Sequence, residues 1–189
     1  RRWNFIAKTK TTMIDSCGLI LQNGLQFFDV GPGEEDRGQY DNSLIMGVSG
    51  AAGLFRLSAL EQIVEQGKYF DEYFFMYKED CDLAYRLQLA GYSSLLVSKA
   101  IMYHDRTVSG GNVWQRFIHR RERSKVANRY AFVNQHFLYI KYWSRQSVGS
   151  KLKIIFWVVV RFFEALLLEQ YLLESYLFIF KGAKVIKKY

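Results

Sequence analysis

Residues 68–86 read Lys68-Tyr69-Phe70-Asp71-Glu72-Tyr73-Phe74-Phe75-Met76-Tyr77-Lys78-Glu79-Asp80-Cys81-Asp82-Leu83-Ala84-Tyr85-Arg86. The first half is an aromatic segment with neither a helical nor a strand period, which predicts a loop. The second half predicts a helix over residues 80–90, because apolar positions recur on one face and Gly91 follows as a stop signal. Acids gather at the start of that helix, where carboxylates cap free N–H groups and oppose the helix dipole.

The segments around this stretch alternate between short strands and helices, which indicates the α/β class. The expected elements are a hairpin at Asn23-Gly24, a buried strand at 44–48 that ends in the small-residue turn Ser49-Gly50-Ala51-Ala52-Gly53, a helix at 58–66 stopped by Gly67, strands at 94–97 and 101–104, and an arginine-rich helix at 112–137.

Composition narrows the class of protein. The chain has 189 residues, and 26 Lys and Arg against 18 Asp and Glu leave a formal charge of +8. Half of the residues are hydrophobic, so the chain has enough apolar surface to offset the entropy lost on ordering, which excludes a disordered protein. Two cysteines without CxxC spacing, Cys17 and Cys81, exclude a disulfide-stapled scaffold and indicate reduced thiols.

The C-terminal part of the chain is strongly apolar and then basic. Residues 152–180 are expected to form a helix, but charged residues interrupt it, so no stretch reaches the roughly 18–20 apolar residues that a membrane span requires. Lysines 181, 184, 187 and 188 follow. We therefore expect an interfacial or packed helix, and the lysines would suit an anionic membrane surface.

Two further features could carry chemistry. Asp82 and Arg86 are spaced i,i+4, which is typical of an ordinary surface ion pair. His104 ends the strand expected after the acidic helix, and such a residue is more often a hydrogen-bonded histidine at a sheet edge than a metal ligand. The order of small-residue turn, aromatic loop, acidic helix start and histidine favours a site, because ligands usually bind at strand ends of an α/β sheet.

Taken together, these residues resemble family 2 glycosyltransferases, and most of all the rhamnosyltransferase-like group. The resemblance rests on Ile14-Asp15-Ser16-Cys17-Gly18, Asp36-Arg37-Gly38-Gln39-Tyr40-Asp41, Val48-Ser49-Gly50-Ala51-Ala52, the stretch 68–86, Ala90-Gly91-Tyr92 and Tyr103-His104. It implies the C-terminal, acceptor-side part of a GT-A mixed-sheet fold followed by C-terminal helices. On this basis residues 1–140 are expected to form a partial catalytic domain, and residues 141–189 a membrane-associated helical tail.

The resemblance also assigns roles to individual residues. In the family the Asp of the Glu-Asp pair is the catalytic base, which corresponds to Asp80, with Glu79 beside it as a second catalytic residue. The family histidine at the end of the later strand helps to hold the metal, which corresponds to His104. At least half of the loop aromatics are nevertheless expected to pack in the core. The residues expected to contact substrate are Gly50, Ala51, Phe70, Asp71, Tyr77, Asp82 and Arg86.

The implied reaction is inverting transfer of a sugar from a nucleotide-sugar donor to a hydroxyl of a glycan or lipid-linked acceptor. A carboxylate beside the hydroxyl takes its proton as the new bond forms. A Mg²⁺ or Mn²⁺ ion offsets the charge of the leaving diphosphate, and oxygen ligands with one imidazole suit these ions.

Other motifs of the family bear on the kind of enzyme. The metal-binding Asp-x-Asp of the family's donor half, which precedes the matching segment, is not present. Asp80-Cys81-Asp82 is not that motif, because residues i and i+2 of a helix do not face each other. No Gln-x-x-Arg-Trp is present, which favours single addition over processive synthesis. The resemblance further implies polysaccharide biosynthesis by a cytoplasmic protein that is peripheral at the inner face of the cell membrane.

Two other classes of function stay open. The basic run from Arg116 to Arg129 allows a nucleic-acid-binding fragment. No recognised nucleic-acid motif accompanies that run, so no nucleic-acid partner is expected, since a charge patch alone describes only a nonspecific field. The other alternative is a non-enzymatic, membrane-associated scaffold that uses residues 152–180.

Overall fold

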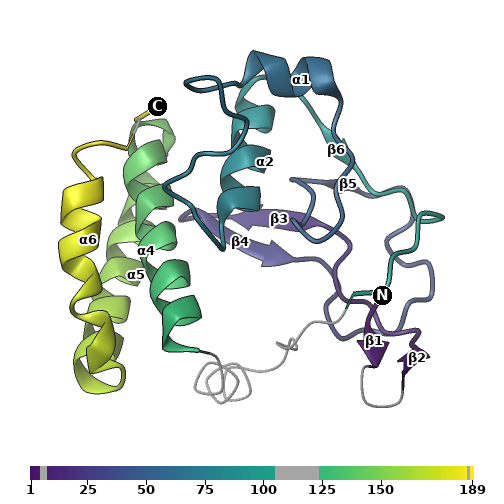
Figure 1. Cartoon of the computed structure of the whole chain (residues 1–189), viewed down its shortest axis with the longest axis horizontal. Coiled ribbons are helices and arrows are strands. Elements are labelled where there is room, and N and C mark those ends of the chain that lie inside the picture. The colour runs from purple at the N-terminus through teal and green to yellow at the C-terminus, as the bar shows by residue number, and fades with distance from the viewer. Residues whose placement is uncertain (5–7, 105–123, 187) are drawn as a thin grey trace. The chain divides into compact units, whose positions relative to one another are not determined.

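The computed structural model describes residues 1–4, 8–104, 124–186 and 188–189, and the chain divides into two compact units. Unit 1 comprises Arg1–Ile20, Phe27–Phe70 and Asp80–Arg123, and unit 2 comprises Leu21–Gln26, Asp71–Glu79 and Ser124–Tyr189. Short strands with two helices make up the described part of unit 1, and helices dominate unit 2 (Figure 1), so the predicted mixed α/β class is confirmed.

The strands are short and pair in twos. They are β1 (Trp3–Asn4), β2 (Thr9–Lys10), β3 (Leu19–Gln22), β4 (Gln26–Asp29), β5 (Leu44–Ile45) and β6 (Ser94–Leu95), paired β1–β2, β3–β4 and β5–β6. The strand predicted at 44–48 is therefore shorter than expected, although Met46 donates a backbone hydrogen bond to Leu19. Gly47 continues this edge, and only a glycine fits there because a Cβ would collide with Ala84.

Two helices complete the described core of unit 1. Helix α1 (Leu57–Gln62) ends earlier than the predicted helix 58–66. Glu65 and Lys68 pair instead across a tight turn, in which Gln66 and Gly67 have positive φ. Helix α2 (Glu79–Leu89) confirms the helix predicted over residues 80–90 to within one residue at each end, and Gly91 has the positive φ of a C′ glycine. The two helices share a core cluster of Ala59, Ile63, Leu83 and Leu87.

The Asp82–Arg86 pair exists as the spacing predicted, but it is buried rather than on the surface. The Arg86 Nε donates to Asp82 Oδ2 at 2.9 Å, and both side chains are 1 % exposed. Arg86 also donates to the carbonyl oxygens of Ile63 at 2.8 Å and Tyr69 at 2.5 Å. A buried guanidinium needs this full set of acceptors, because each unpaired donor would carry a desolvation cost.

Breaking this buried pair should destabilise the protein strongly. We expect Arg86→Met to lower the free energy of unfolding by about 3–5 kcal/mol, because Asp82 loses its cationic partner while it stays buried. The surface pair Arg37–Glu35, at 2.9 Å, provides a matched control, and Arg37→Met should cost about 0.5 kcal/mol or less. Urea unfolding followed by circular dichroism measures both, and equal losses for the two variants would contradict the assignment.

Unit 2 is built around three helices. They are α4 (Lys125–Tyr142), α5 (Val148–Leu167) and α6 (Ser175–Gly182), with short 3₁₀ turns η1 (Trp143–Arg145) and η2 (Gln170–Leu172). Side chains from these elements form one core cluster of Phe132, Ala165, Leu172 and Ile179. Ser124 caps α4 by accepting a hydrogen bond from Ala127 N at 3.1 Å. No described helix combines the length and apolar character of a membrane-spanning segment.

Two predicted helices differ from the observed ones. The helix expected over residues 112–137 is described from Lys125 and continues to Tyr142, while residues 112–123 lie outside the described residues. The helix expected over residues 152–180 is wrong as a single element, because the chain breaks between α5 and α6. At the break Glu169 is buried and its carboxylate accepts a hydrogen bond from the Tyr171 hydroxyl at 2.9 Å, which a straight helix would not allow.

The predicted hairpin at Asn23-Gly24 is confirmed, with Leu25 as a third loop residue. Leu25 is buried and takes a positive φ, so burial of its side chain offsets the backbone strain. Unit 2 holds this tip by polar contacts: Gly24 N donates to Ser150 Oγ at 3.0 Å, and Gln135 Nε2 donates to Leu25 O at 2.9 Å. The Asn-Gly turn and these hydrogen bonds to α4 and α5 therefore stabilise the hairpin together.

Candidate functional site

Unit 1 contains a cavity of about 710 Å³, which lies within the roughly 300–1,000 Å³ typical of ligand sites. The small-residue turn after β5 forms one part of its wall, and the segment that leads to His104 forms another. The polar residues that line it include Asp15, Ser16, Asp36, Asp41, Ser49 and His104. The cavity therefore joins the predicted turn and the predicted histidine in one place.

The strand predicted over residues 101–104 is wrong, because only His104 pairs there, in a single bridge to Arg2 next to β1. His104 is held at this edge from two sides. Its backbone N–H donates to Arg1 O at 3.1 Å, and its carbonyl oxygen accepts from Trp3 N at 2.9 Å. Its Nδ1 lies 2.9 Å from Asp15 Oδ2. The Asp15 side chain is 5 % exposed whereas the His104 side chain is 39 % exposed. The carboxylate of the pair is therefore buried, and the imidazole is accessible to solvent.

Asp80 is the second residue of α2 and lies beside the small-residue turn. Its Oδ2 accepts a hydrogen bond from Gly50 N at 3.0 Å, and its Oδ1 accepts one from Cys81 N at 2.8 Å. Ser49 and Ala51, on either side of Gly50, line the cavity that also contains His104. The structure thus places Asp80 in direct contact with the turn. Gly50 and Asp80 do not themselves line the cavity, whereas both sequence neighbours of Gly50 do.

Charges along the cavity are partly paired. Arg1 Nε donates to Asp36 Oδ2 at 3.1 Å. The Gly38 N–H that donates to Asp36, together with Arg1, lowers the pKa of that carboxyl below its usual value. Burial raises the pKa of the Cys17 thiol, so this cavity cysteine is not an activated nucleophile.

Apart from Gly50 and Ala51 of the small-residue turn, the predicted substrate residues fall into two groups, those engaged inside the protein and those exposed. Asp82 and Arg86 are buried and bonded to each other, so neither presents a surface to a ligand. Asp71 is engaged internally, because Oδ1 accepts from Tyr73 N at 3.1 Å and Oδ2 accepts from Lys141 Nζ at 2.7 Å. Phe70 and Tyr77 are exposed.

Core packing explains less of the aromatic loop than expected. Of the four aromatic residues Phe70, Tyr73, Phe74 and Tyr77, only Phe74 is buried, and it packs edge-on against Phe137 with ring centroids 6.1 Å apart. The prediction that at least half of them are core residues is therefore wrong for this set. The others stay exposed because polar anchors rather than aromatic burial hold the loop.

Those anchors come from α4. Tyr77 and Lys78 both have positive φ, a strained conformation for residues with a Cβ. The fully buried Asn134 donates from Nδ2 to Met76 O and Tyr77 O, both at 2.8 Å. Lys141, also fully buried, pairs with Asp71 near the other end of the loop. These contacts compensate for the backbone strain immediately before Glu79, which is partly buried at the first position of α2.

Sequence reasoning did not assign roles to Asp15, Asp36, Asp41, Asn134 or Lys141. The three aspartates stand in the segments that carry the family resemblance, so a signal for them was present in the sequence. Asn134 and Lys141 lie within a helix whose pattern gives no indication of their partners, since both act on residues that are distant in sequence.

The described residues offer a divalent cation one imidazole rather than a complete site. Within residues 1–4, 8–104, 124–186 and 188–189, no group of three or more His, Cys, Asp or Glu side chains could hold a metal ion. Asp15 lies against Nδ1 of His104, which leaves Nε2 as the ring atom that could bond a ligand. A carboxylate behind a histidine is the usual arrangement around metal-ligating imidazoles, so His104 fits one coordination position.

Comparison with known proteins gives one result. A family model described as Glycosyl transferase family group 2 matches residues 39–181, well over half of the chain, and this range includes both Asp80 and His104. No curated protein and no solved structure shows a significant match. The fold and cavity are those of a mixed α/β domain with a ligand-sized site, and the chain belongs to glycosyltransferase family group 2. Its general activity is sugar transfer, and enzymes of this family often use divalent cations.

Proposed function

We propose that the chain takes part in inverting transfer of a sugar from a nucleotide-sugar donor to a hydroxyl of a glycan or lipid-linked acceptor. One observation carries the proposal. Asp80 is hydrogen-bonded to Gly50 between two residues that line a 710 Å³ cavity, and His104 lines the same cavity. We also propose, more specifically, that the enzyme is rhamnosyltransferase-like and acts in the biosynthesis of a surface polysaccharide.

Asp80 is the proposed general base. The N–H groups of Gly50 and Cys81 each bond one of its oxygens and fix the orientation of the carboxylate. Each carboxylate oxygen can accept more than one hydrogen bond, so the acceptor hydroxyl can still donate to Asp80. The proton moves to this carboxylate as the hydroxyl oxygen attacks the anomeric carbon, and general-base help of this kind is typically worth ~10²–10⁴-fold. Exposed Phe70 is a proposed sugar contact within unit 1, and the predicted sugar contact of Tyr77, which belongs to unit 2, stays a prediction.

Removing the proposed base should abolish transfer and spare donor binding. We expect Asp80→Asn in the natural protein to lower the turnover rate by ~10²–10⁴-fold, because the amide keeps the volume and loses the basic oxygen. Glu79→Gln is the matched comparison one residue earlier. Release of nucleoside diphosphate measures turnover across a panel of nucleotide sugars. Near-normal turnover of Asp80→Asn, or a larger loss in Glu79→Gln, would show that Asp80 is not the general base.

His104 is the proposed metal-binding residue, with Mg²⁺ or Mn²⁺ as the ion. When bound, the ion would offset the charge of the leaving diphosphate. The chain's own part is to present the Nε2 of His104 with Asp15 holding the opposite side of the ring. Mg²⁺ is usually held by one or two carboxylates together with substrate phosphates, so His104 would supply only one of several ligands to the ion.

Metal affinity should therefore depend on both members of the pair. We expect His104→Ala to weaken binding of Mn²⁺ in the presence of a nucleoside diphosphate, and Asp15→Asn to weaken it by roughly 10–100-fold. Electron paramagnetic resonance of free Mn²⁺ measures the affinity without requiring turnover. Asp41→Asn, which changes another cavity aspartate, serves as the control. Unchanged Mn²⁺ affinity in both His104→Ala and Asp15→Asn would remove the metal role.

We also propose that the C-terminal helices contact an anionic membrane surface. Helices α5 and α6 carry many exposed apolar side chains, and exposed lysines lie on or near the same helices. This combination suits the headgroup region of a bilayer, where apolar side chains insert and cations meet anionic lipid. The apolar members are Leu152, Ile155, Phe156, Trp157, Val159, Phe162, Phe163, Leu166, Leu167, Leu177, Phe178 and Phe180. Peripheral association at the inner face of the membrane, with residues 141–189 as the attached tail, stays a prediction on this basis.

Flotation with lipid vesicles tests the membrane proposal. Vesicles that contain phosphatidylglycerol should carry the protein, and pure phosphatidylcholine vesicles should carry less of it. We expect the double variant Phe156→Ser with Phe163→Ser to weaken binding roughly tenfold, because two exposed aromatic side chains no longer insert. Leu54→Ser removes a 98 % exposed leucine from unit 1 and should have no effect. Equal flotation of both variants would contradict the proposal.

A further inference from the structure

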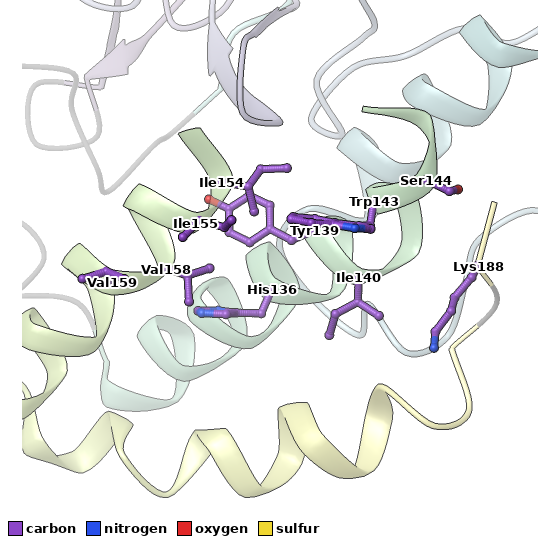
Figure 2. A pocket seen from close by; sticks show the side chains of 10 residues that line it. All are labelled: His136, Tyr139, Ile140, Trp143, Ser144, Ile154, Ile155, Val158, Val159 and Lys188. Atoms are coloured by element: carbon purple, nitrogen blue, oxygen red, sulfur yellow. The ribbon is translucent and has the colours of Figure 1, made fainter. Parts of the chain in front are cut away.

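Unit 2 contains a second cavity, separate from the proposed sugar-transfer site. It is a groove of about 530 Å³ between α4 and α5, lined mainly by aliphatic and aromatic side chains. Figure 2 shows Val158 and Val159 at one end and Ser144 and Lys188 at the other. A groove of this size and composition suits one elongated apolar ligand. The remaining lining residues are His136, Tyr139, Ile140, Trp143, Ile154 and Ile155.

One polar group in this groove is unusual. His136 is 6 % exposed, and its Nδ1 lies 2.8 Å from Phe132 O. A carbonyl oxygen can only accept, so Nδ1 carries the proton. Burial lowers the pKa of His136, which keeps the ring neutral and leaves Nε2 as an acceptor. Nε2 is buried and has no hydrogen-bond partner among the described residues.

The ring of His136 forms part of the wall of the groove. Figure 2 shows it extending from α4 toward Val158 of α5. The other polar ring in the lining, Tyr139, already has a partner, because its hydroxyl accepts from Gln26 Nε2 at 2.5 Å. The groove thus combines an apolar wall with one unfilled acceptor, and an acceptor of this kind is satisfied by a hydroxyl donor.

We propose that this groove binds a single alkyl chain that carries a hydroxyl group, with the hydroxyl donating to His136 Nε2. The apolar lining takes the chain, and the unpartnered nitrogen selects an alcohol over an ether or a hydrocarbon of the same length. The ligand class is a long-chain alcohol or hydroxylated lipid chain. The proposal goes beyond sugar transfer and does not depend on it, since every residue of the groove belongs to unit 2.

Trp143 lines the groove and provides the readout. We expect ω-bromododecanol, titrated below its aggregation concentration without vesicles, to quench tryptophan fluorescence saturably. The signal should disappear in Trp143→Phe and persist in Trp157→Phe, because Trp157 is not among the residues that line the groove. The alcohol should bind about fivefold more tightly than its methyl ether, the effect of one hydrogen bond.

Two pairs of measurements test the site itself. Val158→Phe fills the groove and should weaken binding roughly tenfold, whereas Leu167→Phe enlarges an exposed side chain on the same helix and should not. His136→Phe should abolish the preference for the alcohol over the ether. If that variant does not fold, the comparison of alcohol and ether in the unchanged protein still tests the acceptor.

Four results would overturn the proposal. They are the absence of saturable quenching, equal affinity for the alcohol and the ether in the unchanged protein, equal losses in Val158→Phe and Leu167→Phe, and a dimer detected by light scattering that excludes the probe. The last result would mean that a second copy of the chain covers the groove. Loss of sugar transfer in Asp80→Asn affects none of these readouts, so failure of either proposal is recognised separately.

Discussion

The arrangement of unit 1 around α2 depends on one buried guanidinium. Arg86 pairs with Asp82 on its own helix and reaches the carbonyl oxygens of Ile63, after α1, and Tyr69, before the aromatic loop. A buried guanidinium destabilises the fold when it loses its hydrogen-bond acceptors, so these contacts hold the three segments together. The helix start that carries Asp80 is fixed by the same contacts, and this lets its carboxylate meet the Gly50 N–H.

A second set of buried polar groups acts on the aromatic loop within unit 2. Asn134 and Lys141 on α4 bind the loop through Met76, Tyr77 and Asp71. Because these bonds hold the backbone, the aromatic side chains do not need to be buried, and most of the loop aromatics stay on the surface. A sugar-binding role for exposed aromatic rings requires this kind of polar support, since a loop held only by aromatic burial would hide the rings.

Local signals predicted the helices of unit 1 and the hairpin well, because a glycine stop or an Asn-Gly pair acts over a few residues. They failed where the partner is distant. The surface position expected for Asp82 and Arg86 was wrong, since their spacing shows that they can pair but not what covers them. Helix 152–180 was predicted as one element because its apolar pattern is continuous, whereas the break at Glu169 follows from its burial and its bond to Tyr171.

The sequence by itself determined the class of protein, since the order of a small-residue turn, an aromatic loop, Asp80 and His104 is a property of the chain alone. Only the tertiary structure decided that Asp15 stands behind His104 and that Gly50 donates to Asp80. It also decided that His136 faces an apolar groove with Nε2 unpartnered among the described residues. The reason is physical: periodicity and turn chemistry act between near neighbours, whereas these contacts join side chains that only packing brings together.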